Sequence, residues 1–340
     1  MKKQVLFICS AQKNYTRNEF IVKILNKKYS LKEISSNQKT YFKRSFFVFK
    51  KFIFLKNKKE FDFIYVGFLA QILLPFIRLF YKKKIIADYF ISLYDTLCFD
   101  RKIFKADSLI GKAIFFYEKW TLKMADEIIV DTENSKQFFI DTYKISSKIK
   151  VIYVFANREI FYYQKKKEQK KYDIFFYGSG QSLHGIDIIL KAAKLLEKNN
   201  FSFLLIGPIK KKYKKLIDNL KLKNVFFIDW VEYKKLAEFI SVSDICLGGH
   251  FGNTEKAKRV IAGKTFQFAN MKKAVILGLN KANKELFKDR EDCLMVRMND
   301  EEALAKAIKK LKEDKNLKIK ISENIYTLIK EEELRAFNIL

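Results

Sequence analysis

Short apolar runs alternate with longer segments of helical periodicity along the chain. Apolar runs of this length are typical of strands buried on both faces, and intervening helices connect such strands in parallel. In the first half, the predicted strands are residues 5–9, 63–67, 84–87, 128–131 and 149–153. The predicted helices are residues 18–26, a segment ending near 81 and a long segment ending near 124. This alternation predicts a parallel sheet covered by helices.

The second half repeats the pattern after a polar, mostly basic run at residues 164–171. Its predicted strands are residues 172–177, 203–206, 225–228, 245–247 and 274–277. Its predicted helices are residues 185–198, 213–219, 233–241 and a segment ending near 271. The predicted fold class is therefore α/β, with two Rossmann-like domains built on parallel sheets. The expected organisation is a first domain at 1–163, a linker at 164–171, a second domain at 172–320 and a terminal helix at 321–340.

Length and composition agree with two globular domains. The chain has 340 residues, of which 49% are hydrophobic, with only 11 Gly and 2 Pro, so each half can form its own core. The 68 Lys and Arg exceed the 38 Asp and Glu, which gives a formal charge of +30. Such a surface attracts nucleic acid, anionic lipid or phosphorylated substrates. A compositional bias toward lysine is an equally good explanation of the charge.

Cysteine spacing and hydropathy bear on the compartment. The four cysteines lie far apart without a Cys-x-x-Cys pair, which argues against a metal cluster and favours free thiols. The N-terminal apolar run is too short for a signal peptide. The longest apolar stretch, residues 66–81, is interrupted by polar residues and is shorter than the roughly 20 residues that a spanning helix needs. We therefore expect a cytoplasmic protein.

Four cations precede or begin the helix that ends near residue 271: Lys256, Lys258, Arg259 and Lys264. Cations beside a helix N-terminus form a site for a phosphorylated ligand. The alternative is an ordinary solvated helix face. The whole segment, residues 252–287, resembles the donor-binding segment of the GT4-like branch of the GT-B glycosyltransferases, the glycosyl transferases group 1 family.

This resemblance implies a fold and an activity. In that family two Rossmann-like domains face each other across a cleft, the C-terminal domain binds a nucleotide-diphospho-sugar, and the N-terminal domain binds the acceptor. The expected reaction is sugar transfer, retaining and metal-independent, with no cofactor besides the donor substrate. Arg259 and Lys264 would be catalytic residues that stabilise the departing diphosphate. Lys258, Gln267 and Glu285 would bind the donor.

Two departures from the family pattern matter. The family's paired glutamates, eight residues apart, would fall on Arg259 and Gln267, so this pair is absent. Ala274 stands where the family usually has proline. Gln267 can still bond a ribose hydroxyl, and a protein that keeps the fold without the activity is an alternative.

A glycine-rich turn at residues 177–185 follows one predicted strand and opens a helix, where backbone N–H groups can hold a phosphate. The spacing does not fit a dinucleotide fingerprint, because the third glycine comes too late and the next strand does not end in an acidic residue. The turn is similar to the Gly-x-x-x-x-Leu-His-Gly turn of the same family. The resemblance places Gly178, Gly180 and Gly185 at the donor and gives His184 a diphosphate-binding, catalytic position. Alternatively, His184 caps or packs the helix.

Two further loops follow predicted strands of the second half. The turn at residues 227–233 resembles the family's nucleobase turn, in which backbone groups near Val231 hold the base, so UDP, GDP and ADP donors are not distinguishable. Trp230 either flanks the base or packs in the loop. His250, in the loop after strand 245–247, is either a ligand contact or a bystander.

On the N-terminal side, residues 87–101 resemble the family's Asp-x-x-x-Ser-Leu-Tyr-Asp-Thr segment. Asp88 and Asp95 are therefore the catalytic candidates on the acceptor side, with capping of a helix or loop as the alternative. The sequence has no Asp-x-Asp motif and only two histidines. We therefore expect no metal site.

Lysines and aromatic residues are interleaved between residues 39 and 59. This composition suits an anionic membrane surface. The expected acceptor is therefore a cell-envelope or lipid-linked glycan, and the protein is expected to bind peripherally to the inner face of the cell membrane. No nucleic-acid partner is expected. The alternative is a basic nucleic-acid-binding protein, which would gather its cations on one continuous face.

Overall fold

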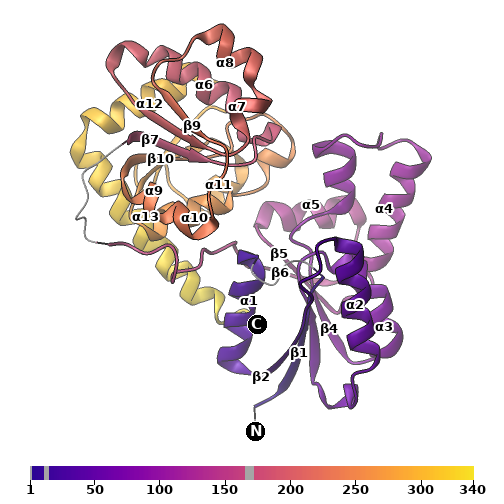
Figure 1. Cartoon of the computed structure of the whole chain (residues 1–340). Coiled ribbons are helices and arrows are strands. Elements are labelled where there is room, and N and C mark those ends of the chain that lie inside the picture. Colours follow the sequence, from indigo (N-terminus) through magenta and orange to yellow (C-terminus); the bar gives the residue numbers. More distant parts are fainter. Residues whose placement is uncertain (1, 11–14, 165–171) are drawn as a thin grey trace. The chain divides into compact units, whose positions relative to one another are not determined.

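The computed structural model describes residues 2–10, 15–164 and 172–340 and forms two compact units (Figure 1). The first unit contains residues 1–155 and 334–340, and the second contains residues 156–333. The predicted linker lies outside the described residues, except for Gln164. Each unit has one six-stranded sheet in which every pairing is parallel. The predicted α/β fold class with two Rossmann-like domains is therefore confirmed.

The sheet of the first unit has the strand order β2-β1-β3-β4-β5-β6. Its strands are β1 (Gln4–Ile8), β2 (Ser30–Ile34), β3 (Phe63–Val66), β4 (Lys84–Asp88), β5 (Glu127–Val130) and β6 (Lys148–Val151). Its helices are α1 (Thr16–Lys28), α2 (Tyr41–Ile53), α3 (Ala70–Phe80), α4 (Leu109–Leu122) and α5 (Glu133–Tyr143). β3 and β5 are buried at every position. Continuous burial explains why these apolar runs do not alternate with polar residues.

In the first unit the sequence reasoning missed β2, α2 and α5. β2 is an edge strand in which only Ile34 is buried, so it lacks a continuous apolar run. α2 turns Val48 and Phe52 into the core and leaves Phe42 and Phe46 exposed, so aromatic residues lie on both of its faces. α2 was missed because the interleaved lysines and aromatic residues of this segment were interpreted as a surface for an anionic membrane and not as a helix.

The sheet of the second unit has the order β12-β11-β10-β7-β8-β9. Its strands are β7 (Tyr172–Tyr177), β8 (Phe203–Ile206), β9 (Val225–Ile228), β10 (Ser243–Gly249), β11 (Ala274–Gly278) and β12 (Leu294–Val296). Its helices are α6 (Ile186–Leu195), α7 (Ile209–Lys212), α8 (Lys214–Leu220), α9 (Leu236–Ser241), α10 (Gly263–Asn270), α11 (Lys281–Leu286) and α12 (Glu301–Glu313). In Figure 1, α6 and α12 cover one face of this sheet, and α9 and α10 cover the other.

Two helix predictions in this unit needed correction. The predicted helix at 233–241 consists of the short helix η5 (Tyr233–Lys235) followed by α9. The predicted helix at 185–198 ends at Leu195 as α6, and a separate short turn, η4 (Glu197–Asn199), follows. Asn200, after that turn, has a positive φ of 57°, which an α-helix does not permit.

The last helix, α13 (Lys315–Ala336), starts before the predicted position of 321. Its inward positions Ile321, Ile325 and Ile329 are fully buried and recur every four residues, as one face of a helix requires. Residues 334–340, which include the end of α13, belong to the first unit. There Lys28 Nζ donates to the Leu340 carbonyl at 2.6 Å, and Lys150 Nζ donates to the Ile339 carbonyl at 2.9 Å.

Candidate functional site

The loops after β7 and β10 meet at the carboxyl edge of the second sheet, where these two strands are neighbours. This edge is the usual ligand position in parallel α/β sheets. The two loops are joined by backbone hydrogen bonds: Phe251 N donates to the His184 carbonyl at 3.4 Å, and Gly252 N donates to the Leu183 carbonyl at 3.1 Å. The loop conformations are therefore fixed relative to each other.

Glycines permit this close approach. A Cβ on Gly252 would lie 2.0 Å from the Ser182 carbonyl oxygen, and a Cβ on Gly278 would lie 1.8 Å from the His250 carbonyl oxygen. Gly185, predicted as a donor residue, has φ of +64° and precedes α6. Its own Cβ would lie 2.5 Å from the Gly252 amide nitrogen. The glycine-rich turn thus serves packing of the two loops as well as any ligand.

His184 and His250 stack on each other between these loops. Their ring centroids are 5.7 Å apart and their planes differ by 14°. Their exposed fractions are only 9% and 5%, and neither Nδ1 atom has a hydrogen-bond partner in the structure. Burial, and then the charge of Lys264, lower the pKa of both imidazoles, that of His250 to about 3. Both rings are therefore neutral near pH 7.

Lys264 lies in the first turn of α10 and is 7% exposed. Its ammonium group has no hydrogen-bond partner and lies over the ring of Phe176, 3.9 Å from the centroid. Burial lowers the pKa of Lys264 to about 7. A buried ammonium without hydrogen bonds is unfavourable, so an anion that reached it would be strongly held.

His184 and Lys264 converge on the space above Gly178, the first residue after β7. A Cβ built on Gly178 would lie 3.1 Å from His184 Nδ1 and 3.1 Å from Lys264 Nζ. Both groups therefore reach the same face of Gly178, and neither His184 Nδ1 nor Lys264 Nζ has a hydrogen-bond partner among the described residues. A ligand oxygen that approached this face could accept from both groups. Thr265, on the same turn as Lys264, also buries a hydroxyl without a partner.

Gln267, a predicted donor ligand, is 4% exposed and held by two tyrosines. Its side-chain oxygen accepts a short hydrogen bond from the Tyr177 hydroxyl, and its Nε2 donates to the Tyr233 hydroxyl at 2.8 Å. These contacts tie α10 to the end of β7 and to the turn before α9. They give Gln267 a packing function that the sequence did not reveal.

The remaining donor-side predictions lie around this cluster. Lys258 forms an exposed ion pair with Glu255 at 2.6 Å, while Arg259 and Glu285 are partly exposed. Gly180 has φ of +67°, and its carbonyl accepts from the Tyr213 hydroxyl at 3.3 Å. Val231 is partly exposed beside Trp230, which is 78% exposed and therefore not part of a packed core. Their roles toward a donor stay predictions.

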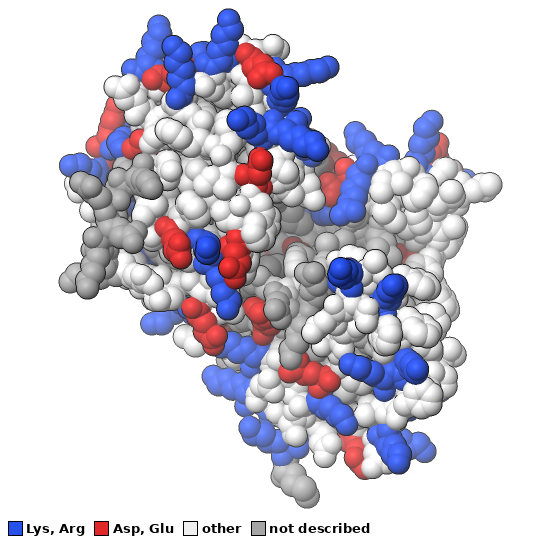
Figure 2. Space-filling model, viewed as in Figure 1, with Lys and Arg blue, Asp and Glu red and all other residues white. Residues whose placement is uncertain are grey.

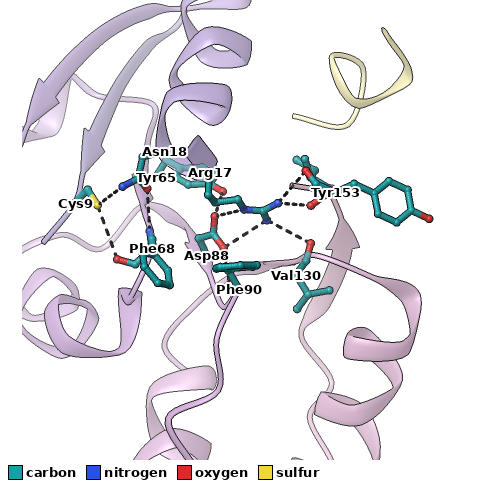
Figure 3. A network of polar contacts seen from close by, with 10 residues as sticks. Cys9, Arg17, Asn18, Tyr65, Phe68, Asp88, Phe90, Val130 and Tyr153 are labelled. Atoms are coloured by element: carbon teal, nitrogen blue, oxygen red, sulfur yellow. Dashed lines mark hydrogen bonds and ion pairs between the residues drawn. The ribbon is translucent and has the colours of Figure 1, made fainter. Parts of the chain in front are cut away.

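In the first unit, Asp88 ends β4 inside a buried polar network (Figure 3). Arg17 Nε donates to Asp88 Oδ2 at 2.9 Å, and the Tyr65 hydroxyl donates to the same oxygen at 3.1 Å. The Arg17 guanidinium also donates to backbone carbonyls, including that of Val130 at 3.3 Å. Asp88 has no exposed surface. These contacts favour a structural role, and its catalytic role stays a prediction.

Asp95, the other acceptor-side candidate, is 5% exposed and begins a π-helix (Asp95–Asp100). The preceding loop is held by Glu118, which the sequence reasoning missed. The fully buried Glu118 carboxylate accepts hydrogen bonds from Ser92 Oγ at 2.6 Å, Leu93 N at 2.8 Å and the Tyr143 hydroxyl at 2.6 Å. No local signal marks Glu118, because its partners come from three separate parts of the sequence.

Among residues 2–10, 15–164 and 172–340, no group of three or more His, Cys, Asp or Glu side chains is arranged to hold a metal ion. Within the same ranges, no helix combines the length and the apolar composition needed to cross a membrane.

Comparison with known proteins finds similarity to glycosyltransferases. Residues 171–314 match the family model described as glycosyl transferases group 1. The chain is 24% identical over 308 residues to an uncharacterized glycosyltransferase of Methanocaldococcus jannaschii. The aligned region covers 83% of this chain and 74% of that protein. It is 26% identical over 247 residues to an uncharacterized 41.2 kDa protein in the cps region of Klebsiella pneumoniae, which covers 64% of this chain and 63% of that protein.

Solved structures agree in fold. Sucrose-phosphate synthase from Thermosynechococcus elongatus superimposes with a TM-score of 0.74 at 14% identity, covering 98% of this chain and 97% of that one. HepE of Anabaena, in complex with UDP and glucose, superimposes with a TM-score of 0.71 at 13% identity, covering 99% and 98%. The protein has the GT-B fold. Its second unit matches the glycosyl transferases group 1 model over most of its length, in agreement with the resemblance in the sequence.

Proposed function

We propose that the protein transfers a sugar from a nucleotide-diphospho-sugar and that the diphosphate binds above Gly178. The observation that carries this proposal is the buried ammonium of Lys264, which has no hydrogen-bond partner among the described residues and reaches the same face of Gly178 as His184 Nδ1. A diphosphate oxygen that approached this face could accept from both groups. HepE, which shares the fold, was solved with UDP and with UDP-glucose, so UDP-sugars are the first donors to test.

The proposed chemistry is stabilisation of the leaving group. When the bond between the sugar and the diphosphate breaks, negative charge grows on the diphosphate. The Lys264 ammonium, the His184 N–H and the N-terminus of α10 are already positioned for that charge, so little reorganisation is needed. Arg259 and Lys258 would add cationic contacts from the preceding turn. We propose that these groups replace a metal and that transfer retains the anomeric configuration.

The test is a thermal-shift screen of UDP-, GDP- and ADP-sugars, followed by transfer assays with each donor that binds. A ligand that binds only the folded chain raises its apparent stability with the logarithm of ligand concentration. We expect a concentration-dependent rise for one nucleotide class and turnover with it. No shift with any nucleotide-sugar at millimolar concentration would contradict the proposed function.

We further propose that the acceptor is a cell-envelope or lipid-linked glycan, reached by peripheral binding to an anionic membrane. α2 exposes large aromatic side chains, with Phe42 at 84% and Phe46 at 57% exposure, and Phe54 just after it at 74%. α3 lies beside α2, since Phe49 contacts Phe76 with ring centroids 5.1 Å apart. Exposed Leu79 and Phe80 of α3 extend the same apolar surface. Apolar residues flanked by lysines are typical of an interfacial helix.

Sedimentation with vesicles tests this membrane contact. Neutralising Lys50, Lys51, Lys56 and Lys59 should release the protein from vesicles containing anionic lipid, because each lysine near such a surface contributes about 1 kcal/mol. Lys309 of the second unit is the control, since its ammonium is paired with the Glu313 carboxylate at 3.8 Å. Equal binding to neutral and anionic vesicles would contradict the electrostatic contact.

The charge distribution gives no support to the nucleic-acid alternative. On the face in Figure 2, Lys and Arg side chains spread over both units, with Asp and Glu among them, and do not form one continuous stripe. A nucleic-acid backbone would instead favour cations concentrated along one track.

A further inference from the structure

Three basic side chains are buried together at the candidate donor site. Lys264, His184 and His250 are each at least nine-tenths buried and come together at the edge of the second sheet. We infer that the donor diphosphate binds with uptake of a proton, that Lys264 receives this proton, and that His250 is a further, neutral ligand of the donor site. This inference rests on the proposed function and concerns how the same site is loaded.

The surroundings of the cluster are cationic or apolar. The rings of Phe176 and Tyr177 lie against the Lys264 ammonium, 3.9 and 5.4 Å from it. The charge of Lys212 lowers the pKa of His184, and the charge of Lys256 lowers the pKa of His250. Among the described residues, no carboxylate acts on the pKa of either imidazole or of Lys264. The empty site therefore favours the uncharged form of each group.

The absence of acidic side chains around Lys264, among the described residues, sets how donor affinity changes with pH. Burial lowers the pKa of Lys264 to about 7 in the empty site, so much of this lysine is neutral above that pH. A diphosphate beside the amine would restore a high pKa, and the bound state would hold more protons than the free state. Donor affinity must then fall as pH rises above about 7. A nucleoside diphosphate itself is almost fully ionised there, because its last phosphate pKa is about 6.

The histidines complete the site in their neutral form. The parallel stack at 5.7 Å would place two like charges face to face if both rings were protonated. A neutral imidazole still has one N–H to donate. His250 stacks on His184, and its own Nδ1 is buried without a hydrogen-bond partner among the described residues, so this nitrogen can donate to a second oxygen of the same diphosphate.

The experiment is calorimetric titration of the full chain with UDP, GDP and ADP between pH 7 and 8.5, in two buffers with different ionisation enthalpies. For the nucleotide that binds, we expect uptake approaching one proton at pH 8 and a dissociation constant that rises by up to about tenfold per pH unit. Lys264→Met should bind more weakly and lose the pH slope. Lys264→Arg should lose the slope because its charge does not titrate.

The histidine variant separates the two parts of the inference. His250→Asn should weaken binding severalfold and keep the pH slope, whereas Lys309→Ala, far along α12, should change neither. Binding of wild type without proton uptake, or a slope that persists in Lys264→Met, would overturn the assignment to Lys264. Unchanged affinity in His250→Asn would overturn the role of His250. Failure of every nucleotide to bind would instead contradict the proposed function itself.

Discussion

Two buried cations, one in each unit, have opposite surroundings. Arg17 in the first unit is fully buried, pairs with Asp88 at 2.9 Å and donates to backbone carbonyls. Burial alone would lower the pKa of Arg17, but the Asp88 carboxylate raises it overall. Lys264 in the second unit has neither a carboxylate nor a hydrogen bond, and burial lowers its pKa to about 7.

The difference separates structural residues from ligand-binding ones. Arg17 pairs with Asp88, and Lys264 lies near His184. The sequence had marked both Asp88 and His184 as catalytic. Only the network around Asp88 is complete without a ligand. Lys264 has no hydrogen-bond partner among the described residues, and the proposed diphosphate would supply one.

The largest expected effect is on the stability of the first unit. Asp88→Ala would leave the Arg17 guanidinium buried without its counter-ion, and breaking such a pair costs about 3–5 kcal/mol. Urea unfolding should show this loss. Lys309→Ala is the control, because its exposed pair with Glu313 at 3.8 Å is worth at most about 1 kcal/mol. A loss no larger than that of the control would contradict the structural role of Asp88.

The matching change in the second unit should spare stability and impair function. Lys264→Met removes a charge that has no partner, so the free energy of unfolding should stay the same or rise. A charge-assisted hydrogen bond to the diphosphate contributes about 1.5–3 kcal/mol, so donor affinity should fall by roughly ten- to a hundredfold. Destabilisation comparable to that of Asp88→Ala, with unaltered donor affinity, would remove the contrast between the two sites.

Arg259→Ala sharpens the comparison at the edge of the same site. Loss of one charge-assisted contact should lower turnover about tenfold with the fold intact. Lys258→Ala should have a smaller effect, because its ammonium is already paired with Glu255. Steady-state kinetics of both variants, with circular dichroism of each, provide the measurement. Wild-type turnover in Arg259→Ala would exclude Arg259 from leaving-group stabilisation.

The smallest expected effect is that of chelation. If Lys264, His184 and Arg259 stabilise the leaving diphosphate, excess EDTA should leave the rate of sugar transfer unchanged. Loss of activity that manganese or magnesium restores would show that a metal supplies this charge instead.

The sequence predicted the strands best where apolar residues follow one another directly. β7, β8 and β9 match their predicted ranges, and this holds for the fully buried β8 as well as for the edge strand β9, because all four residues of each are apolar. The edge strand β2 was missed, since one buried residue gives no pattern.

The site was predicted only in part, for a physical reason. Motifs placed Gly178 and His184 on one turn and Lys264 on another segment, but nothing in the sequence shows which buried groups have partners. That property depends on contacts between distant segments, as for Gln267 between two tyrosines. For the same reason the sequence left His250 undecided and did not mark Glu118.

The most direct test of the central claim is calorimetric titration of Gly178→Ala beside the wild type with the nucleoside diphosphate that binds. The added methyl group would lie 3.1 Å from both His184 Nδ1 and Lys264 Nζ and 2.9 Å from His184 Cε1, so it would crowd the face of Gly178 that both groups reach. It adds no backbone strain, since Gly178 is not among the glycines of positive φ. The account predicts an intact fold and at least about tenfold weaker binding. Wild-type affinity in Gly178→Ala would show that the diphosphate binds elsewhere.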